Sequence, residues 1–245
     1  MTEVVPGVHV VQTEPMGTAG PANVTLLVAD GEITLVDAGY PGTGRLIGEY
    51  LAGIGRRWGD VGRIIVTHHH PDHTGGLAEA VDMSGAEVWA HRDDAGIIDG
   101  SRPRPPLSEA ALEARLADVP PEKREAAIAR IRQTPPPRTV PVDLRLVGGE
   151  ELRALGGVQI LHTPGHTEGH LSLYLPAHSL LIAGDLLRCQ DGLIVAASPG
   201  FSADYPEALA TGKAIVTLGF DKVVCYHGGW VTSGAQGLLS DELRS

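Results

Sequence analysis

The chain has 245 residues, of which 42% are hydrophobic and 4% aromatic, and it contains 32 glycines and 18 prolines. This length and apolar content allow a sizeable core in one large domain or two small ones. The glycines and prolines favour many short elements over long helical repeats. A formal net charge of −11 disfavours binding to a phosphate backbone or an anionic lipid surface. We therefore expect no nucleic-acid or membrane partner.

Two further features of the sequence bear on the cellular compartment of the protein. The first residues carry no basic segment followed by an apolar one, and no apolar run in the sequence has the length of a membrane span. The two cysteines, Cys189 and Cys225, lack the spacing of a CxxC or zinc-finger motif, so a disulfide framework is not expected. These features predict a cytoplasmic protein, with a secreted mature chain as the alternative.

Short apolar runs predict strands in the first third of the chain, at residues 7–13, 23–30 and 33–39, with Asp30 and Gly31 suited to a hairpin turn. A helix, a buried strand, a second helix and another strand are expected at 43–54, 62–67, 76–83 and 86–91. Strands return at 158–163, 170–175, 179–184 and 222–227, with helices at 206–218 and at the C-terminus. The repeated pattern of strands and helices predicts two similar α/β halves placed back to back.

Residues 101–141 differ in composition from the rest of the chain. They are rich in proline, arginine, alanine and glutamate, and they contain two amphipathic helical segments between the sequences PRPP and PPPR. We interpret this stretch as a helical insertion within a single domain of residues 1–245, acting either as a lid over a site or as a contact in a homodimer. The short basic groups at Arg56–Arg57 and Arg102–Arg104 are interpreted as solvated faces.

Four histidines and an aspartate lie within six consecutive residues, His68 to His73, directly after a predicted strand. Where a strand ends, side chains at i and i+2 point the same way, so His68 and His70 can converge on one ion while His69 points to the other side. Asp72 and His73 follow at the turn into the next helix, where they can hold a second ion. Imidazole and carboxylate groups suit zinc and similar divalent metals.

A site with two ions needs further ligands from distant segments. Three candidates lie at the ends of predicted elements: His166 in TPGH, Asp185 in AGD and His227 in YHGG. Glycines stand beside all three and permit close approach of the backbone to a site.

The order of these motifs resembles the metallo-β-lactamase fold superfamily. The pattern HxHxDH, then TPGH, GD and a late HG, occurs in the family's order, and Asp37 in LVDAG matches its early aspartate. The resemblance implies an α/β fold, a four-layer αββα sandwich. It implies that His68, His70 and His166 hold one metal ion, that Asp72, His73 and His227 hold a second, and that Asp185 bridges both. It places Asp37 and His170 behind the ligands as supports, and His69, His162 and His178 are interpreted as strand or supporting residues.

The resemblance also implies a hydrolase for small molecules. A hydroxide bridging two divalent ions, zinc before iron or manganese, would attack an ester, thioester or lactone carbonyl. Asp185 and Asp72 are the candidate catalytic carboxylates, Asp185 through the bridge and Asp72 by orienting the nucleophile or carrying a proton to the leaving group. The ions, hydroxide and carboxylates together leave a small positive charge, which suits negative charge developing on oxygen.

Within the superfamily, the chain resembles glyoxalase II around TPGHTEGH, and acyl-homoserine lactonases in its seven ligands and length class. Lactonases carry a tyrosine where this chain has Arg188, which we interpret either as a substrate-binding cation or as a surface arginine beside Asp191. A β-lactam hydrolase is an alternative that Asp185 disfavours, since the main zinc β-lactamase classes have Cys or Ser there. Another alternative, a mononuclear iron persulfide dioxygenase, has no need of the complete second ligand set.

Overall fold

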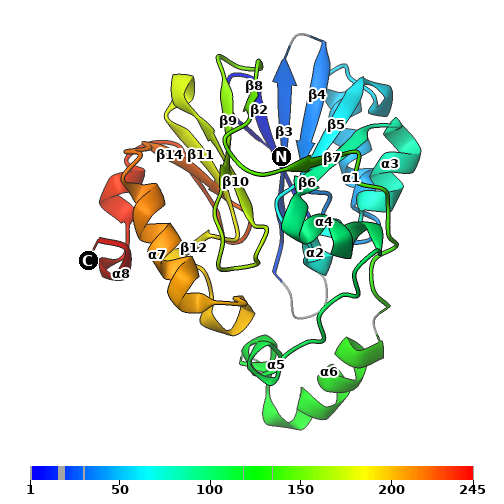
Figure 1. Ribbon diagram of the computed structural model, residues 1–245, viewed down its shortest axis with the longest axis vertical. Coiled ribbons are helices and arrows are strands. Elements are labelled where there is room, and N and C mark those ends of the chain that lie inside the picture. Colours follow the sequence, from blue (N-terminus) through cyan, green and yellow to red (C-terminus); the bar gives the residue numbers. More distant parts are fainter. Residues whose placement is uncertain (1, 16–19, 30, 118, 134, 245) are drawn as a thin grey trace.

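The computed structural model describes residues 2–15, 20–29, 31–117, 119–133 and 135–244. Two large sheets lie face to face, and helices cover their outer faces (Figure 1). This is the four-layer αββα arrangement that the sequence predicted. The predicted hairpin turn at Asp30 lies outside the described residues.

The first sheet contains seven strands in sequential order. They are β1 (Thr2–Val5), β2 (Val8–Gln12), β3 (Asn23–Ala29), β4 (Glu32–Val36), β5 (Val61–Val66), β6 (Glu87–His91) and β7 (Leu144–Leu146). Strands β1 to β4 pair antiparallel, whereas β4 to β7 run parallel. Parallel neighbours need crossover connections, and these carry α1 (Thr43–Gly53), η1 (Trp58–Asp60), α2 (Pro71–Thr74), α3 (Leu77–Ser84) and α4 (Arg92–Asp99).

The second sheet has the order β15-β14-β11-β10-β9-β8. Its strands are β8 (Glu151–Leu152), β9 (Val158–His162), β10 (Leu171–Leu175), β11 (Leu180–Gly184), β14 (Lys222–Cys225) and β15 (Gly229–Val231), with η2 (Pro176–His178) between β10 and β11. Only β11 and β14 pair in parallel within it. Their connection contains the hairpin β12 (Leu187–Gln190) and β13 (Leu193–Ala196), η3 (Pro199–Phe201) and α7 (Tyr205–Val216). After β15 come η4 (Ala235–Leu238) and α8 (Asp241–Arg244).

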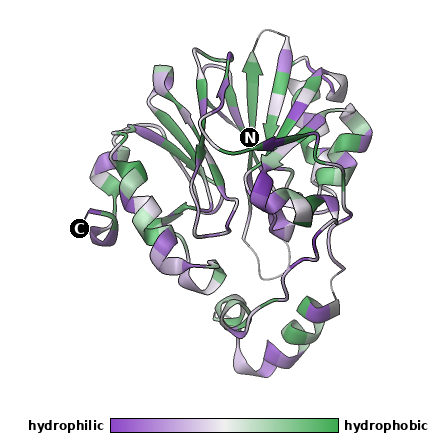
Figure 2. Cartoon of the chain, viewed as in Figure 1, coloured by the Kyte–Doolittle hydropathy of each residue, from purple (hydrophilic) through white to green (hydrophobic). Residues whose placement is uncertain are grey.

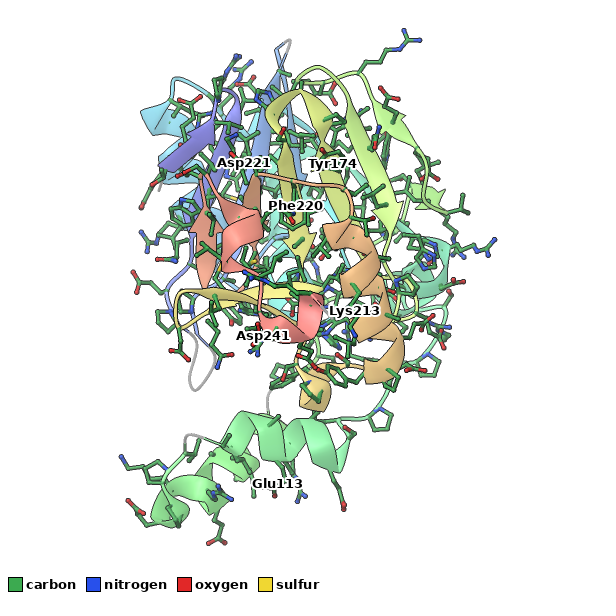
Figure 3. All side chains as sticks on the ribbon, turned by 90° about the vertical axis from the view of Figure 1, so that its left-hand side faces the viewer. Glu113, Tyr174, Lys213, Phe220, Asp221 and Asp241 are labelled. Atoms are coloured by element: carbon green, nitrogen blue, oxygen red, sulfur yellow. The ribbon has the colours of Figure 1, made fainter. Side chains whose placement is uncertain are left out.

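Alternate residues of the central strands enter different cores. In β3, Leu26 packs in the cluster that includes residues of α1, whereas Leu27 faces the other sheet. In β11, Ile182 packs between the sheets and Leu181 packs in the outer cluster that contains Phe220. Strands buried on both faces appear in sequence as continuous apolar runs, and Figure 2 shows hydrophobic residues along the strands of both sheets. Figure 3 looks onto the outer layer over the second sheet and labels Phe220, which is fully buried.

The insertion at 101–141 contains two helices, α5 (Glu109–Leu116) and α6 (Pro121–Gln133). Ser108 caps α5, because its hydroxyl accepts a hydrogen bond from the amide of Ala111 at 3.1 Å. Both helices lie beyond the edge of the sandwich at which α2 is found (Figure 1). Helix α5 contacts η3, so the insertion connects the two halves of the chain at that edge.

Most predicted elements are present, with ends shifted by a few residues. Two differences concern the site. The strand predicted at 33–39 ends at Val36, because Asp37 takes a left-handed conformation with φ 63°. The strand predicted at 222–227 ends at Cys225, so His227 lies beyond it. In the described part of the chain, no helix is long and apolar enough to span a membrane.

Replacing Leu173 with Ala should destabilise the protein by about 2–5 kcal/mol, since its fully buried side chain fills the space between the sheets. Replacing Leu193, which is 45% exposed, should change the free energy of unfolding by less than about 1 kcal/mol. Urea denaturation of both variants measures the difference. Equal losses of stability in the two variants would contradict the packing of Leu173 in the core between the sheets.

Candidate metal centre

The seven predicted ligands gather at one edge of the sandwich, in two groups. The first group contains His68, His70, His166 and Asp185, and the second contains Asp72, His73, Asp185 and His227. In each group, one potential ligand atom from every residue lies within 4.8 Å of the others. They come from the loop after β5, the loop after β9 and the residues that follow β11 and β14. Asp185 belongs to both groups.

In the first group, three imidazole rings turn nitrogen atoms toward one another. His70 Nδ1 lies 2.9 Å from His68 Nε2 and 3.0 Å from His166 Nε2. A neutral ring nitrogen offers either one proton or one lone pair, and His68 Nε2 has a lone pair when His68 Nδ1 donates to the Thr67 hydroxyl oxygen. If His70 Nδ1 donates to one neighbour, it cannot also donate to the other. A shared cation can satisfy all three nitrogens.

The second group contains buried polar atoms with no hydrogen-bond partner. His73 Nε2 and Asp185 Oδ1 lie 3.4 Å apart, and both are buried without a hydrogen bond. Across the group, His227 Nε2 lies 3.0 Å from Asp72 Oδ2 and 3.6 Å from Asp185 Oδ2. Unpaired buried polar atoms are rare in folded proteins because they cost free energy. Nitrogen and carboxylate donors in this arrangement fit divalent metal ions.

The two groups differ in the protonation of their histidines. Burial, and then the neighbouring histidines, hold the pKa values of His68 and His70 well below the ordinary value. Burial lowers the pKa of His166 to about 3. These rings are therefore neutral at pH 7, which is the form that binds metals.

In the second group, neighbouring carboxylates reverse the effect of burial. Burial alone would lower the pKa of His73, but Asp37, Asp185 and Asp72 raise it well above its ordinary value. The pKa of His227 is raised as well, since Asp185 and Asp72 outweigh its burial. Burial opposes the charged form of Asp185, yet His227 and His73 outweigh it and hold the pKa of Asp185 well below its usual range.

Asp37 orients ligands on one side of the histidine-rich loop. One oxygen accepts from the Thr67 amide at 2.8 Å, and the other lies 2.8 Å from both the Thr67 hydroxyl and His73 Nδ1. Since the hydroxyl proton goes to Asp37, the Thr67 oxygen can accept from His68 Nδ1 at 3.1 Å. In the neutral form that binds a metal ion, each ring then has its proton on Nδ1 and its lone pair on Nε2, the atom that faces the other ligands.

Asp94 supports the other side of the same loop, and it also reaches the TPGH loop. Its carboxylate accepts from the His69 amide at 2.9 Å and lies 2.9 Å from His69 Nδ1. It accepts from the Thr167 hydroxyl at 2.9 Å and from the Gly169 amide at 3.0 Å. His69 points away from the ligands, as predicted. Asp94 thus connects the loop that carries His68 and His70 to the loop that carries His166.

His170 and Tyr226 contact the ligands from behind. The amide of Asp185 donates to His170 Nε2 at 3.0 Å, so that ring cannot offer Nε2 to a metal. The Tyr226 ring stacks on His73 with centroids 3.6 Å apart, and its hydroxyl donates to the carbonyl of Asp72 at 2.6 Å. Both residues therefore restrict the positions of neighbouring ligands.

Glycines allow the close approach that the sequence predicted. At Gly165, with φ 117°, an added Cβ would lie 2.1 Å from the Ala208 nitrogen at the start of α7. At Gly228, with φ 87°, it would lie 1.7 Å from the carbonyl oxygen of Cys189. Any larger residue would push the loops bearing His166 and His227 away from the site.

A third group of potential ligands, His91, Asp93 and His162, lies outside the centre. The two rings stack with centroids 4.0 Å apart and planes only 9° from parallel. A metal ion binds an imidazole nitrogen in the plane of the ring, and two stacked parallel planes do not meet. This geometry does not offer one ion a shared site.

Arg188 lies in a different environment. It lines a surface cavity of about 310 Å³ together with Tyr205 and Glu242, and its Nη2 donates to Gln190 Oε1 at 3.0 Å. In the described residues it forms an ion pair with neither Asp191 nor a predicted metal ligand. Its role in substrate binding stays a prediction.

Sequence reasoning missed Thr67, Asp94 and Tyr226. Asp94 had a usable signal, because it follows a predicted strand at 86–91 and the ends of neighbouring strands meet at one edge of a sheet. Thr67 and Tyr226 each stand next to a predicted ligand, but nothing in the local sequence indicates that their side chains turn toward other segments.

Replacing Asp94 with Asn should weaken metal binding by the first group by about 10-fold to 100-fold, since a support of ligand loops is lost. Asp93, on the same turn of α4, provides the control in Asp93→Asn. Competition with a chromogenic chelator measures the Kd for metal in each variant. Thermal unfolding of the metal-free proteins tests whether a variant is destabilised as a whole. An unchanged Kd in Asp94→Asn would contradict this role.

Comparison with known proteins places this geometry in a family. The family model of the metallo-beta-lactamase superfamily matches residues 17–227. The uncharacterized protein YobT of Bacillus subtilis is 29% identical over 192 residues, which cover 78% of this chain and 72% of YobT. Hydroxyacylglutathione hydrolase of Pseudomonas aeruginosa is 33% identical over 126 residues, which cover 51% of this chain and only 32% of that enzyme.

A solved structure agrees with these sequence matches. A metallo-beta-lactamase family protein of Thermus thermophilus superposes with a TM-score of 0.69 at 25% identity, covering 96% of this chain and 77% of that one. The family match, the fold and the histidine and aspartate groups lead to one assignment. The chain belongs to the metallo-β-lactamase superfamily, as a hydrolase with a histidine and aspartate metal-binding cluster.

Proposed function

We propose that this hydrolase uses two divalent metal ions to cleave an ester, thioester or lactone bond of a small molecule. The observation that carries the proposal is the pair of ligand groups that share Asp185. His68, His70 and His166 would hold one ion, and Asp72, His73 and His227 the other, with Asp185 between them. Zinc is the metal that this donor set favours, with iron and manganese as alternatives.

Metal ions bound there would polarise a carbonyl and lower the pKa of coordinated water. The chain's own residues hold that chemistry in place. Asp185 lies between His166 and His73, so its position determines the spacing of the two groups. The side chains of Asp72 and His227 are 23% and 26% exposed, whereas His73 is fully buried. A substrate would therefore approach from the side of Asp72 and His227.

Asp72 is the carboxylate at this open side. Burial opposes its charged form, but His73 and His227 outweigh burial and lower the pKa of its carboxyl, so it is ionised at neutral pH and can accept a hydrogen bond from water. One oxygen lies 3.0 Å from His227 Nε2. We assign Asp72 the role of orienting the attacking water and carrying a proton to the leaving group.

Three observations bear on the reaction that is catalysed. The relative named hydroxyacylglutathione hydrolase supports a thioester as the bond that is cleaved, although the match covers only 32% of that enzyme. The complete second ligand group disfavours a mononuclear iron oxygenase, and Asp185 disfavours a β-lactam hydrolase. We also propose that the insertion acts as a lid that shapes the substrate pocket, and the contact of α5 with η3, which joins the insertion to the second half of the chain, supports this.

Replacing Asp185 with Asn should reduce metal content and turnover together, with a loss of activity of about 100-fold or more, because both groups lose a shared ligand. Asp191→Asn, at an exposed aspartate six positions along, is the control. Elemental analysis and a panel of lactone, thioester, phosphoester and β-lactam substrates supply the measurements. Full activity with full metal loading in Asp185→Asn would refute the shared role.

Metal occupancy should depend on pH differently in the two groups. Because the pKa values of His73 and His227 are raised while those of His68, His70 and His166 are lowered, protons compete with the metal in the second group at a higher pH. As the pH falls, one equivalent of metal should leave before the other. Dialysis at stepwise pH, followed with cobalt(II) by visible absorption, tests this order. Simultaneous loss of both equivalents would contradict it.

A further inference from the structure

Arg104 is a half-buried cation beside the metal centre. Its Nη1 donates a hydrogen bond to the carbonyl oxygen of His69, the residue between His68 and His70. Among the described residues it forms no ion pair with a carboxylate. The carboxylates of Asp94 and Asp72 act on it from a distance, and a buried charge without a direct ion pair costs free energy. A cation in such a position is therefore suited to an anion that arrives with the substrate.

The segment that carries Arg104 is held in place before any ligand binds. Pro103, Pro105 and Pro106 surround it, and prolines fix their own φ and favour extended backbone at the residue before them. Arg102 anchors the same segment, since its amide donates to the Gly96 carbonyl at 2.7 Å. The side chain of Arg102 also lies 3.5 Å from Glu168 Oε2. Arg104 therefore loses little conformational entropy on binding a ligand.

We propose that Arg104 binds a carboxylate of the substrate, so that the enzyme acts on esters, thioesters or lactones whose acyl part carries a second, negatively charged carboxylate. This inference rests on the proposed function. A guanidinium has five N–H donors in one plane and binds a carboxylate in a bidentate manner. The acyl part is the portion whose carbonyl reacts at the metal centre, and Arg104 contacts the peptide between two of its ligands.

Arg104 keeps its positive charge in this environment. Burial lowers the pKa of Arg104, while the negative charges of Asp94 and Asp72 oppose that effect. The guanidinium stays protonated at neutral pH.

The competing interpretation is purely structural. In that case Arg104 only clamps the His69 carbonyl, and its loss would disturb the ligand loop. The variant Arg104→Gln would then lose metal and bind every ligand less well. A role in recognition predicts a loss confined to ligands that carry the second carboxylate.

Calorimetry with succinate and butyrate separates the two interpretations, because only succinate has a second carboxylate. The zinc-loaded wild-type protein should bind succinate on the order of 10-fold more tightly than butyrate. Arg104→Gln should lose this preference and keep its metal, and Arg104→Lys should keep part of it. Arg92→Gln, which removes a side chain that is 64% exposed, should keep it in full.

Kinetics provide the second measurement. With a succinyl thioester and the butyryl thioester of the same thiol, Arg104→Gln should raise KM for the succinyl substrate by about 10-fold and leave the butyryl values unchanged. Equal binding of succinate and butyrate by the wild type, an unchanged preference in Arg104→Gln, or metal loss with equal weakening of both ligands would overturn the proposal. If no ester, thioester or lactone is cleaved while the calorimetric preference is present, the proposed function fails and the carboxylate site stands.

Discussion

The approach of seven potential metal ligands to one another, four of them buried, is the constraint on which this structure depends. His70 Nδ1 lies 2.9 Å from one ring nitrogen and 3.0 Å from another, and His73 Nε2 and Asp185 Oδ1 are buried with no hydrogen-bond partner. Without cations such a cluster costs free energy, since unpaired polar groups have left water. The three apolar cores between and outside the sheets supply the stabilisation that holds the cluster together.

Strand order explains how the donors are held. Strands β4, β5 and β6 run parallel and side by side, so the segments after them meet at one edge of the sheet. The histidine-rich loop follows the middle strand, Asp37 follows β4, and Asp94 lies in the helix after β6. One buried carboxylate therefore supports each side of the ligand loop. Asp37 orients His73, whereas Asp94 joins His69 to Thr167 in the loop after β9.

In the proposed reaction, chemistry and substrate recognition come from different parts of the chain. The ligands and their supports belong to the two sheets and the loops that follow their strands, which determine where a carbonyl would be attacked. Arg104 and α5 belong to the insertion, and α5 reaches across to η3. A scaffold that positions the reactive groups, with a variable segment that selects the substrate, allows one fold to serve many reactions.

The sequence by itself determined the element types, because apolar periodicity is a local property, and its motifs predicted the layer arrangement and the ligand set through their resemblance to a known superfamily. It could not determine which side chains outside these motifs turn toward the ligands. Asp94 is indistinguishable from Asp93 in sequence, yet only Asp94 reaches the TPGH loop. Arg104 looked like part of a solvated basic group, and only the path of the insertion brings it to His69. Tertiary structure decided these contacts, because they join segments whose distance in space depends on how the whole chain packs.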